Sequence, residues 1–153
     1  MTLPGESPPV NILLVEDNPG DVRLIREVFG EASLRHHLNV VMDGEAALDF
    51  LGKKGSFSGV LKPDLVLLDL NLPKKNGLHV LKEIKCDRLL RRIPVVVLSS
   101  SNAEKDILAG YELHANAYIT KPGNLDQFVE AILSIKDFWL EIASLPIESN
   151  GLA

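Results

Sequence analysis

The chain has 153 residues, of which 46% are hydrophobic and 24% are charged, a composition typical of one soluble globular domain. Its net charge of −5 argues against nucleic-acid binding, which usually requires a basic face. A single cysteine, Cys86, excludes an internal disulfide. No segment has the roughly 20 consecutive apolar residues of a membrane span. The first residues lack the pattern of a signal peptide, so we expect a cytoplasmic protein.

Apolar runs and helical periodicity alternate along the chain. Five short apolar runs predict strands at 11–15, 38–42, 64–69, 93–98 and 117–120. Helical spacing of apolar residues predicts helices at 19–33, 44–52, 77–85, 103–113 and 124–144. Several of the strands are apolar throughout, which is typical of a parallel sheet covered on both faces. The chain is therefore predicted to be a doubly wound α/β domain over residues 10–145, with a flexible leader at 1–9 and a flexible tail at 146–153.

Polar side chains stand where the predicted strands end. Glu16 and Asp17 follow the first strand, Asp69 ends the third, Ser99 follows the fourth and Lys121 follows the fifth. In doubly wound sheets the functional site lies beyond the carboxyl ends of the central strands, so we expect these five side chains to meet. Two carboxylates about 4 Å apart repel by roughly 4 kcal/mol at an effective dielectric constant of about 20. Either the pKa values of the acids rise, or a cation lies among them.

The acids predict a magnesium site. Oxygen ligands from a few carboxylates, with room for water and phosphate, suit Mg²⁺, whereas no cluster of His and Cys supports zinc. We expect Asp17 and Asp69 to bind the ion directly, and Asn71 to offer its backbone carbonyl. Glu16 is expected to act mostly through a bound water.

The same residues suit phosphoryl transfer. A carboxylate can act as a covalent nucleophile toward phosphorus, and phosphoryl transfer depends mainly on positioning and charge neutralisation. We therefore predict that Asp69 accepts a phosphoryl group, that the Lys121 ammonium binds one phosphoryl oxygen and that the Ser99 hydroxyl binds another.

Each residue also has an ordinary interpretation when it is taken alone. Glu16 and Asp17 could satisfy amides at a helix N-terminus, Asp69 could cap a turn, and Lys121 could lie on the surface. Two other functions compete with phosphoryl acceptance. A phosphohydrolase of the haloacid-dehalogenase type needs an acid two residues after its nucleophile, where this chain has Asn71. A module that only binds a partner, without phosphorylation, would not need all five of the polar residues that follow the strands.

Four segments together resemble the response-regulator receiver domain of two-component signalling. They are VEDN at 15–18, LLDLNLPKKNG at 67–77, VVVLSSS at 95–101 and AYITKP at 117–122. The resemblance covers roughly residues 10 to 145 and implies a flavodoxin-like and CheY-like sheet with strand order 2-1-3-4-5 and five helices. It also implies Mg²⁺ as the cofactor, for which Mn²⁺ can substitute, and a cis peptide bond between Lys121 and Pro122.

The resemblance implies a role for each polar residue and for one aromatic residue. These roles are phosphoacceptor for Asp69, metal-binding acids for Glu16 and Asp17, switch hydroxyl for Ser99, switch aromatic for Tyr118 and phosphoryl-binding lysine for Lys121. The chain departs from the family at two positions. His114 stands where many members have Gly, and a left-handed backbone is costlier there for His. Ser99 replaces the more usual Thr, so the hydroxyl is kept and a methyl group is lost.

A narrower resemblance concerns the partner. DNPGD, HHLNVVMDGEAALDFL, LHANAYITKP and DFWL are similar to segments of small regulators paired with phytochrome-type histidine kinases. The implied partners are a sensor histidine kinase and a second copy of the chain. The dimer would form through the fourth helix, the fifth strand and the last helix, where Phe138 and Trp139 extend an apolar face. The lengths before residue 10 and after 145 predict no DNA-binding domain.

Overall fold

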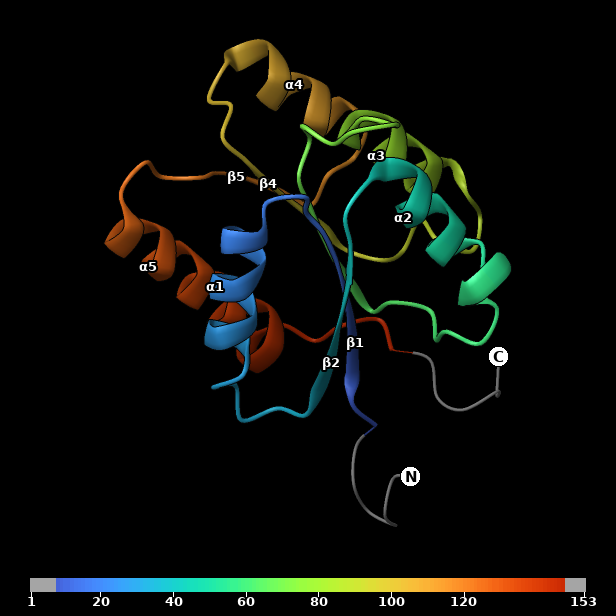
Figure 1. Cartoon of the computed structure of the whole chain (residues 1–153), viewed down its shortest axis with the longest axis horizontal. Coiled ribbons are helices and arrows are strands. Elements are labelled where there is room, and N and C mark those ends of the chain that lie inside the picture. The colour runs from blue at the N-terminus through green and yellow to red at the C-terminus, as the bar shows by residue number, and fades with distance from the viewer. Residues whose placement is uncertain (1–7, 148–153) are drawn as a thin grey trace.

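The structure is a computed structural model that describes residues 8–147, so most of the predicted leader and tail lies outside the described residues. Its strands are β1 (Val10–Val15), β2 (His36–Val41), β3 (Leu65–Leu68), β4 (Val95–Ser99) and β5 (Ala117–Thr120). All neighbouring strands are parallel, in the order β2-β1-β3-β4-β5. The predicted doubly wound α/β fold and its strand order are therefore confirmed (Figure 1).

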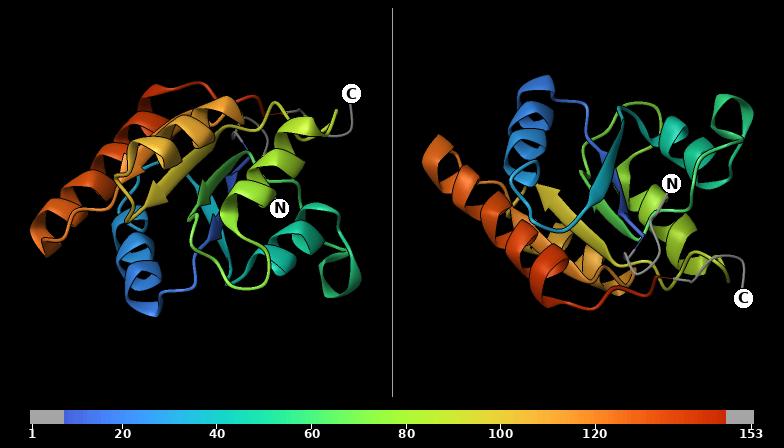
Figure 2. Two further views of the ribbon diagram at one scale, coloured as in Figure 1. Left: turned by 90° about the horizontal axis from the view of Figure 1, so that it is seen from above. Right: turned by 90° about the horizontal axis from the view of Figure 1, so that it is seen from below.

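Five α-helices connect and flank the strands. They are α1 (Pro19–Phe29), α2 (Gly44–Leu51), α3 (Gly77–Cys86), α4 (Glu104–Glu112) and α5 (Leu125–Lys136), with a short 3-10 helix η1 (Gly55–Phe57) after α2 and a π-helix η2 (Asp137–Ile142) after α5. Figure 2 shows α1 and α5 on one face of the sheet, and α2, α3 and α4 on the other. No described helix is long and apolar enough to cross a membrane.

The sheet separates two apolar cores. Leu13 and Val66 point into the core beneath α2 and α3, whereas Ile12 and Leu65 point into the core beneath α1 and α5. All four residues of β3 and all five of β4 are buried. Helices on both faces explain why these strands carry no alternating polar residues. At roughly 1.5–3 kcal/mol for each buried large apolar side chain, this burial supplies most of the driving force for folding.

Three predicted features differ from the structure. α1 ends at Phe29 and not near Ser33, because Gly30 caps it and the chain then turns to begin β2. The last helix leaves α-helical geometry after Lys136, and the next six residues wind as the π-helix η2. The described residues contain no cis peptide bond, so the predicted cis bond between Lys121 and Pro122 is wrong. A trans bond before proline is intrinsically favoured by about 0.5–1 kcal/mol. With the trans bond in place, the Lys121 side chain still reaches Glu16 in the acidic site.

Two glycines fix the loop between β3 and α3, which follows Asp69. A Cβ atom on Gly77 would overlap the backbone oxygen of Asp69, and one on Gly44 would overlap the backbone oxygen of Lys75. The Gly44 amide also donates a hydrogen bond to the Pro73 carbonyl. The N-terminus of α2 therefore packs directly against this loop.

Candidate phosphoryl-acceptor site

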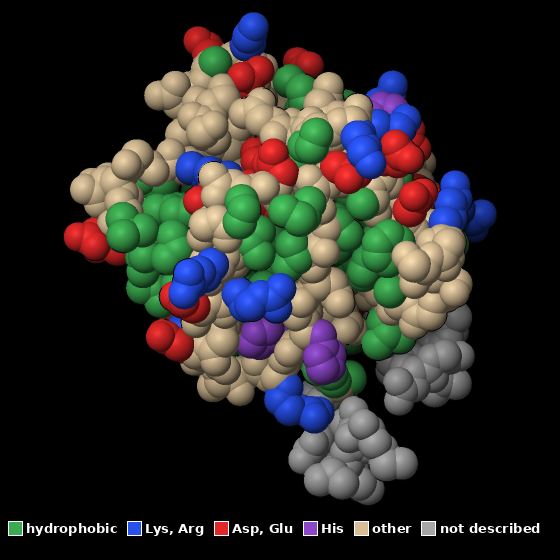
Figure 3. Space-filling model, in the orientation of Figure 1, with side chains coloured by type: hydrophobic (Ala, Val, Ile, Leu, Met, Phe, Trp, Pro, Cys, Tyr) green, Lys and Arg blue, Asp and Glu red, His purple; other side chains and the backbone are tan. Residues whose placement is uncertain are grey.

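Three acids meet at the carboxyl edge of the sheet. Val15 pairs with Leu68 in the register of β1 and β3, so the residues that follow these strands lie side by side. Glu16, Asp17 and Asp69 each offer a carboxylate oxygen, and the three oxygens lie within 4.8 Å of one another. Glu16 and Asp69 are buried, at 1% and 7% exposure, whereas Asp17 is exposed. The predicted convergence of these acids is confirmed. On the face of the molecule drawn in Figure 3, acidic side chains gather in the upper middle.

Lys121 compensates part of this negative charge. Its Nζ donates hydrogen bonds to Glu16 Oε1 at 2.6 Å and to Asp21 Oδ2 at 2.9 Å, and it lies 3.5 Å from Asp69 Oδ2. The structure thus brings the predicted lysine to the predicted acids. Asp21 is an additional acid that the sequence analysis did not assign to the site. Its sequence position, three residues after the Asn18 cap and in the first turn of α1, indicates only a helix start and gives no signal of the contact with Lys121.

Burial and charge set the protonation of this pair. Burial raises the pKa of Glu16 to about 7; the hydrogen bond from Lys121 opposes this rise, and Asp69 adds to it. Burial alone would lower the pKa of Lys121, but its hydrogen bonds to Glu16 and Asp21 outweigh burial and raise it above the ordinary value. Lys121 is therefore a permanent cation at neutral pH, and Glu16 exchanges its proton near neutrality.

The acidic cluster fits a hard divalent cation. Its donors are all carboxylate oxygens, and the exposed Asp17 leaves a side open to water, as Mg²⁺ prefers. Within residues 8–147, no other group of His, Cys, Asp and Glu is arranged to hold a metal ion. The Asn71 backbone N–H donates to Asp69 Oδ1 at 3.2 Å, which places the Asn71 backbone beside the cluster. The role of its carbonyl as a ligand remains a prediction.

Ser99 and Tyr118 are joined through Ser101. The Ser99 side chain is fully buried, and its Oγ accepts a hydrogen bond from the Ser101 N–H at 3.2 Å. The Tyr118 hydroxyl donates to the Ser101 carbonyl at 2.8 Å, and the Ser101 hydroxyl donates to Asp106 Oδ2 on α4 at 2.5 Å. A hollow of about 130 Å³ adjoins this network and is lined by both Ser99 and Asn71. The two predicted switch residues are therefore physically connected.

α4 makes two further contacts with β5. The Tyr111 hydroxyl accepts a hydrogen bond from the Tyr118 backbone N–H at 3.1 Å. Gly110 lies against the Tyr118 ring, where an added Cβ would approach Tyr118 Cδ2 to 3.2 Å. His114, just beyond α4, has φ of 69°, which is the left-handed backbone that costs His more than Gly.

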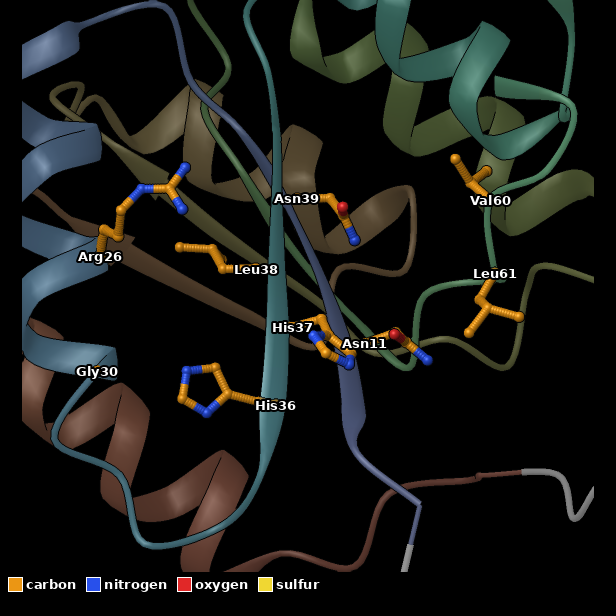
Figure 4. Close-up of a pocket in the computed structure, with 9 residues that line it drawn as sticks. All are labelled: Asn11, Arg26, Gly30, His36, His37, Leu38, Asn39, Val60 and Leu61. Atoms are coloured by element: carbon orange, nitrogen blue, oxygen red, sulfur yellow. The ribbon is translucent and has the colours of Figure 1, made fainter. Parts of the chain in front are cut away.

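A larger hollow lies at the opposite end of the sheet, around the start of the edge strand β2 (Figure 4). Its volume is about 550 Å³, and it is lined by Asn11, Arg26, Gly30, His36, His37, Leu38, Asn39, Val60 and Leu61. The His36 Nδ1 is within 3.0 Å of the Leu34 carbonyl, and its ring packs edge-on against Phe29. None of the three clustered acids, Glu16, Asp17 and Asp69, lines this hollow, so it is separate from the acidic cluster.

The sheet order and the placement of three carboxylates and a lysine at its carboxyl edge define a CheY-like α/β domain. The chain belongs to the response regulator receiver domain family, whose model matches residues 12–133. It is 49% identical over 140 residues to response regulator Rcp1 of Synechocystis sp., covering 92% of this chain and 95% of that protein. It is 40% identical to a probable methanogenesis regulatory protein, FilR2, of Methanothrix harundinacea, covering 86% and 84% of the two chains.

Solved structures agree with this assignment. The Mn²⁺-bound form of Rcp1 superposes with a TM-score of 0.90 and 48% identity, covering 91% of this chain and all of that chain. The phosphorylated cyanobacterial phytochrome response regulator RcpA superposes with a TM-score of 0.89 and 48% identity, covering 92% and all of the two chains. This chain is therefore a receiver-domain response regulator homologous to phytochrome response regulators.

Proposed function

We propose that this protein accepts a phosphoryl group on Asp69 from the phosphohistidine of a sensor histidine kinase. The observation that carries the proposal is the arrangement of the acids and the lysine. The carboxylates of Glu16, Asp17 and Asp69 offer oxygens within 4.8 Å of one another, and the Lys121 ammonium lies 3.5 Å from Asp69. A nucleophilic carboxylate beside a cation site and a fixed ammonium is what phosphoryl transfer requires.

In the transfer step, a carboxylate oxygen of Asp69 forms a bond to phosphorus. The bond between phosphorus and the histidine nitrogen breaks, and that nitrogen keeps the electron pair. Lys121 and Ser99 bind the oxygens of the transferred group. Asp69 and Asp17 would hold Mg²⁺ or Mn²⁺.

The Asn71 carbonyl and Glu16, the latter through water, would complete the metal site. The ion supplies charge neutralisation for the phosphoryl oxygens. Water later attacks phosphorus and releases inorganic phosphate, so we expect slow self-dephosphorylation. Beyond phosphoryl transfer to Asp69 and hydrolysis of the resulting acyl phosphate, we expect no turnover of substrates, because Asn71 cannot serve as the general acid of a phosphohydrolase.

Phosphorylation would signal through Ser99 and Tyr118. The Ser99 hydroxyl would move toward the phosphoryl group, and the Ser101 backbone between Ser99 and Tyr118 would carry the change to β5 and α4. This is a population shift, and a shift from 1:99 to 99:1 needs about 5.5 kcal/mol of preference for the active state. Charge-assisted hydrogen bonds from Ser99 and Lys121 to the phosphoryl oxygens supply part of this preference.

The relatives support a phytochrome-type kinase as the donor. One similar structure is that of a phosphorylated phytochrome response regulator, and another similar protein is a response regulator in red light signaling of R. palustris, with a TM-score of 0.80 and 37% identity.

We also propose a cytoplasmic homodimer that acts without direct DNA binding. Its interface would be α4, β5, α5 and η2, where Phe138 is 50% exposed and Ile142 is 71% exposed.

Intact-protein mass after incubation with acetyl phosphate tests the proposal. With Mg²⁺ the wild-type protein is expected to gain one phosphoryl group, and without Mg²⁺ or in Asp69→Asn it is expected to gain none. Asp64→Asn is a matched control, because Asp64 is also a buried acid but is not in the cluster. Equal uptake by Asp69→Asn would show that the nucleophile is another residue. No uptake by any variant would instead favour a module that binds its partner without phosphorylation.

A further inference from the structure

The Lys121 ammonium is held more closely by Asp21 than by the proposed phosphoacceptor. Its Nζ lies 2.9 Å from Asp21 Oδ2 and 3.5 Å from Asp69 Oδ2, and only the contact with Asp21 is a hydrogen bond. Glu16 provides the other hydrogen bond, at 2.6 Å. An ammonium has three N–H donors, so these two acids occupy most of its capacity.

Asp21 does not belong to the acidic cluster that suits a metal ion. An acid in the first turn of a helix usually interacts with the helix dipole, and Asp21 is in the first turn of α1. Its carboxylate is nevertheless directed to Lys121. The Asp21 backbone N–H is fixed by the Asn18 side chain at 3.1 Å. The contact is also largely withdrawn from water, since the Lys121 side chain is 11% exposed and the Asp21 side chain 22% exposed.

We propose that Asp21 is a positioning residue that competes with Asp69 for the Lys121 ammonium and holds it by a hydrogen bond until a phosphoryl group on Asp69 replaces Asp21 as the acceptor. This inference rests on the proposed function, because a phosphoryl oxygen on Asp69 is the competing acceptor. Lys121 exchanges the Asp21 carboxylate for that oxygen when the acyl phosphate forms. The contact with Asp21 is therefore present only in the unphosphorylated protein, which it stabilises. Asp21 thus lowers the phosphorylated fraction at a given donor concentration.

The test compares the steady-state ratio of phosphorylated to unphosphorylated protein in acetyl phosphate and Mg²⁺, measured by intact mass. Asp21→Asn is expected to raise this ratio roughly three- to tenfold, as for the loss of a partly buried ion pair. Asp21→Glu restores a carboxylate and is expected to bring the ratio back toward the wild-type value. Asp126→Asn, an exposed acid in the first turn of α5, is the matched control and is expected to behave as wild type.

A second comparison separates contact with Lys121 from a general effect of charge. Asp21→Asn is combined with Lys121→Met, or with Lys121→Gln if melting shows that the first double variant is unfolded. If Asp21 acts through Lys121, its substitution has no effect in this background. An equal gain in both backgrounds, or no gain in Asp21→Asn alone, would overturn the inference while leaving the proposed function intact. Absence of uptake by the wild-type protein would overturn both.

Discussion

The hydroxyl group of Tyr118 donates a hydrogen bond of 2.8 Å to the backbone carbonyl of Ser101. The N–H of the same Ser101 donates to the Ser99 Oγ. Ser99 and Tyr118 are therefore linked through a single residue, and the Tyr118 backbone N–H contacts α4 through the Tyr111 hydroxyl. The connection from the proposed phosphoryl site to α4 therefore consists of the side chains of Ser99, Tyr118 and Tyr111 and the short loop at residues 99–101.

Tyr118→Phe is expected to separate phosphorylation from the response of α4. The substitution removes only the hydroxyl that binds Ser101, so uptake of phosphate from acetyl phosphate should stay close to the wild-type level. The change in amide hydrogen exchange over α4 on phosphorylation should be lost or strongly reduced. Tyr111→Phe, which leaves the bond between Tyr118 and Ser101 in place, is the companion variant. A full exchange response in Tyr118→Phe would show that this hydrogen bond does not carry the signal.

The stabilising effect of Mg²⁺ is expected to depend on pH through Glu16. The pKa of Glu16 is about 7 in the folded protein and ordinarily 4.5, so between these values the folded protein holds a proton that the unfolded chain lacks. The higher proton affinity of Glu16 in the folded protein stabilises the fold. This stabilisation is complete below about pH 4.5 and is lost as the pH rises through 7. Mg²⁺ competes with the same proton, so it should bind more tightly at pH 8 than at pH 6.

Thermal melting with and without Mg²⁺ at these two pH values measures the effect. The rise in melting temperature caused by Mg²⁺ should be clearly larger at pH 8 than at pH 6. In Glu16→Gln, which cannot titrate, the difference between the two pH values should become small. An equal Mg²⁺-induced rise at both pH values in the wild type would contradict the assignment of the titrating group to Glu16.

The fold and most of the site could be predicted from the sequence for a specific reason. Strands covered on both faces must be apolar throughout, so the polar residues that end them stand out, as Asp69 does after four buried residues. Parallel strands bring their carboxyl ends to one edge, and this places Glu16 next to Asp69. The local pattern and the topology are sufficient to make these acids converge.

The features that the sequence did not predict depend on tertiary contacts. Asp21 follows a cap and a proline, so its sequence position predicts only a helix start, and its contact with Lys121 joins residues 100 positions apart. The end of α1 at Phe29 is not evident from the sequence because apolar residues continue into the turn, where Ala32 and Leu34 pack against the core without being helical. The π-helical turn after Lys136 has no distinct sequence pattern, although it buries Leu140 and exposes Phe138.

The loop that follows Asp69 should be sensitive to an added methyl group at two glycines. In Gly77→Ala the new Cβ would overlap the Asp69 backbone oxygen, and in Gly44→Ala it would overlap that of Lys75, so the loop must shift in either variant. We expect a loss of roughly 1–3 kcal/mol of stability, as for overpacking, together with weaker Mg²⁺ binding and slower phosphorylation. Chemical denaturation and Mg²⁺ titration measure these changes. Gly59→Ala, whose Cβ would meet nothing within 4 Å, should match the wild type in both assays.

Lys85 should contribute to stability through three hydrogen bonds. Its Nζ donates to the carbonyls of Arg91 and Ile93 and to Asn116 Oδ1, and its burial lowers its pKa. Lys85→Met removes the donor to the two carbonyls, whereas Asn116 Oδ1 keeps its hydrogen bond from the Val95 N–H, and we expect a cost of about 1–3 kcal/mol. Urea denaturation measures this loss. Lys82→Met, on an exposed position of the same helix, is the control and should change stability little. Equal stability in the two variants would show that water replaces the lost donor without cost.

Dimerisation is best tested at Phe138, which is half exposed and packs edge-on against Trp139. Removing all residues after Lys136 would also delete Leu140, which is buried in the core beneath α1 and α5, and would therefore disturb the fold. Phe138→Ser removes apolar surface without opening the core. We expect it to weaken the dimer by about tenfold or more in Kd, as for an aromatic side chain at an interface.

Sedimentation at several protein concentrations, before and after phosphorylation, measures this dissociation constant. Leu89→Ser is the control, because Leu89 is 69% exposed but lies in the connection between α3 and β4 and not on the proposed interface. It should leave the dissociation constant unchanged. If Phe138→Ser and wild type have the same mass in solution at every concentration, the exposed Phe138 side chain does not form the dimer contact and the proposed interface is wrong.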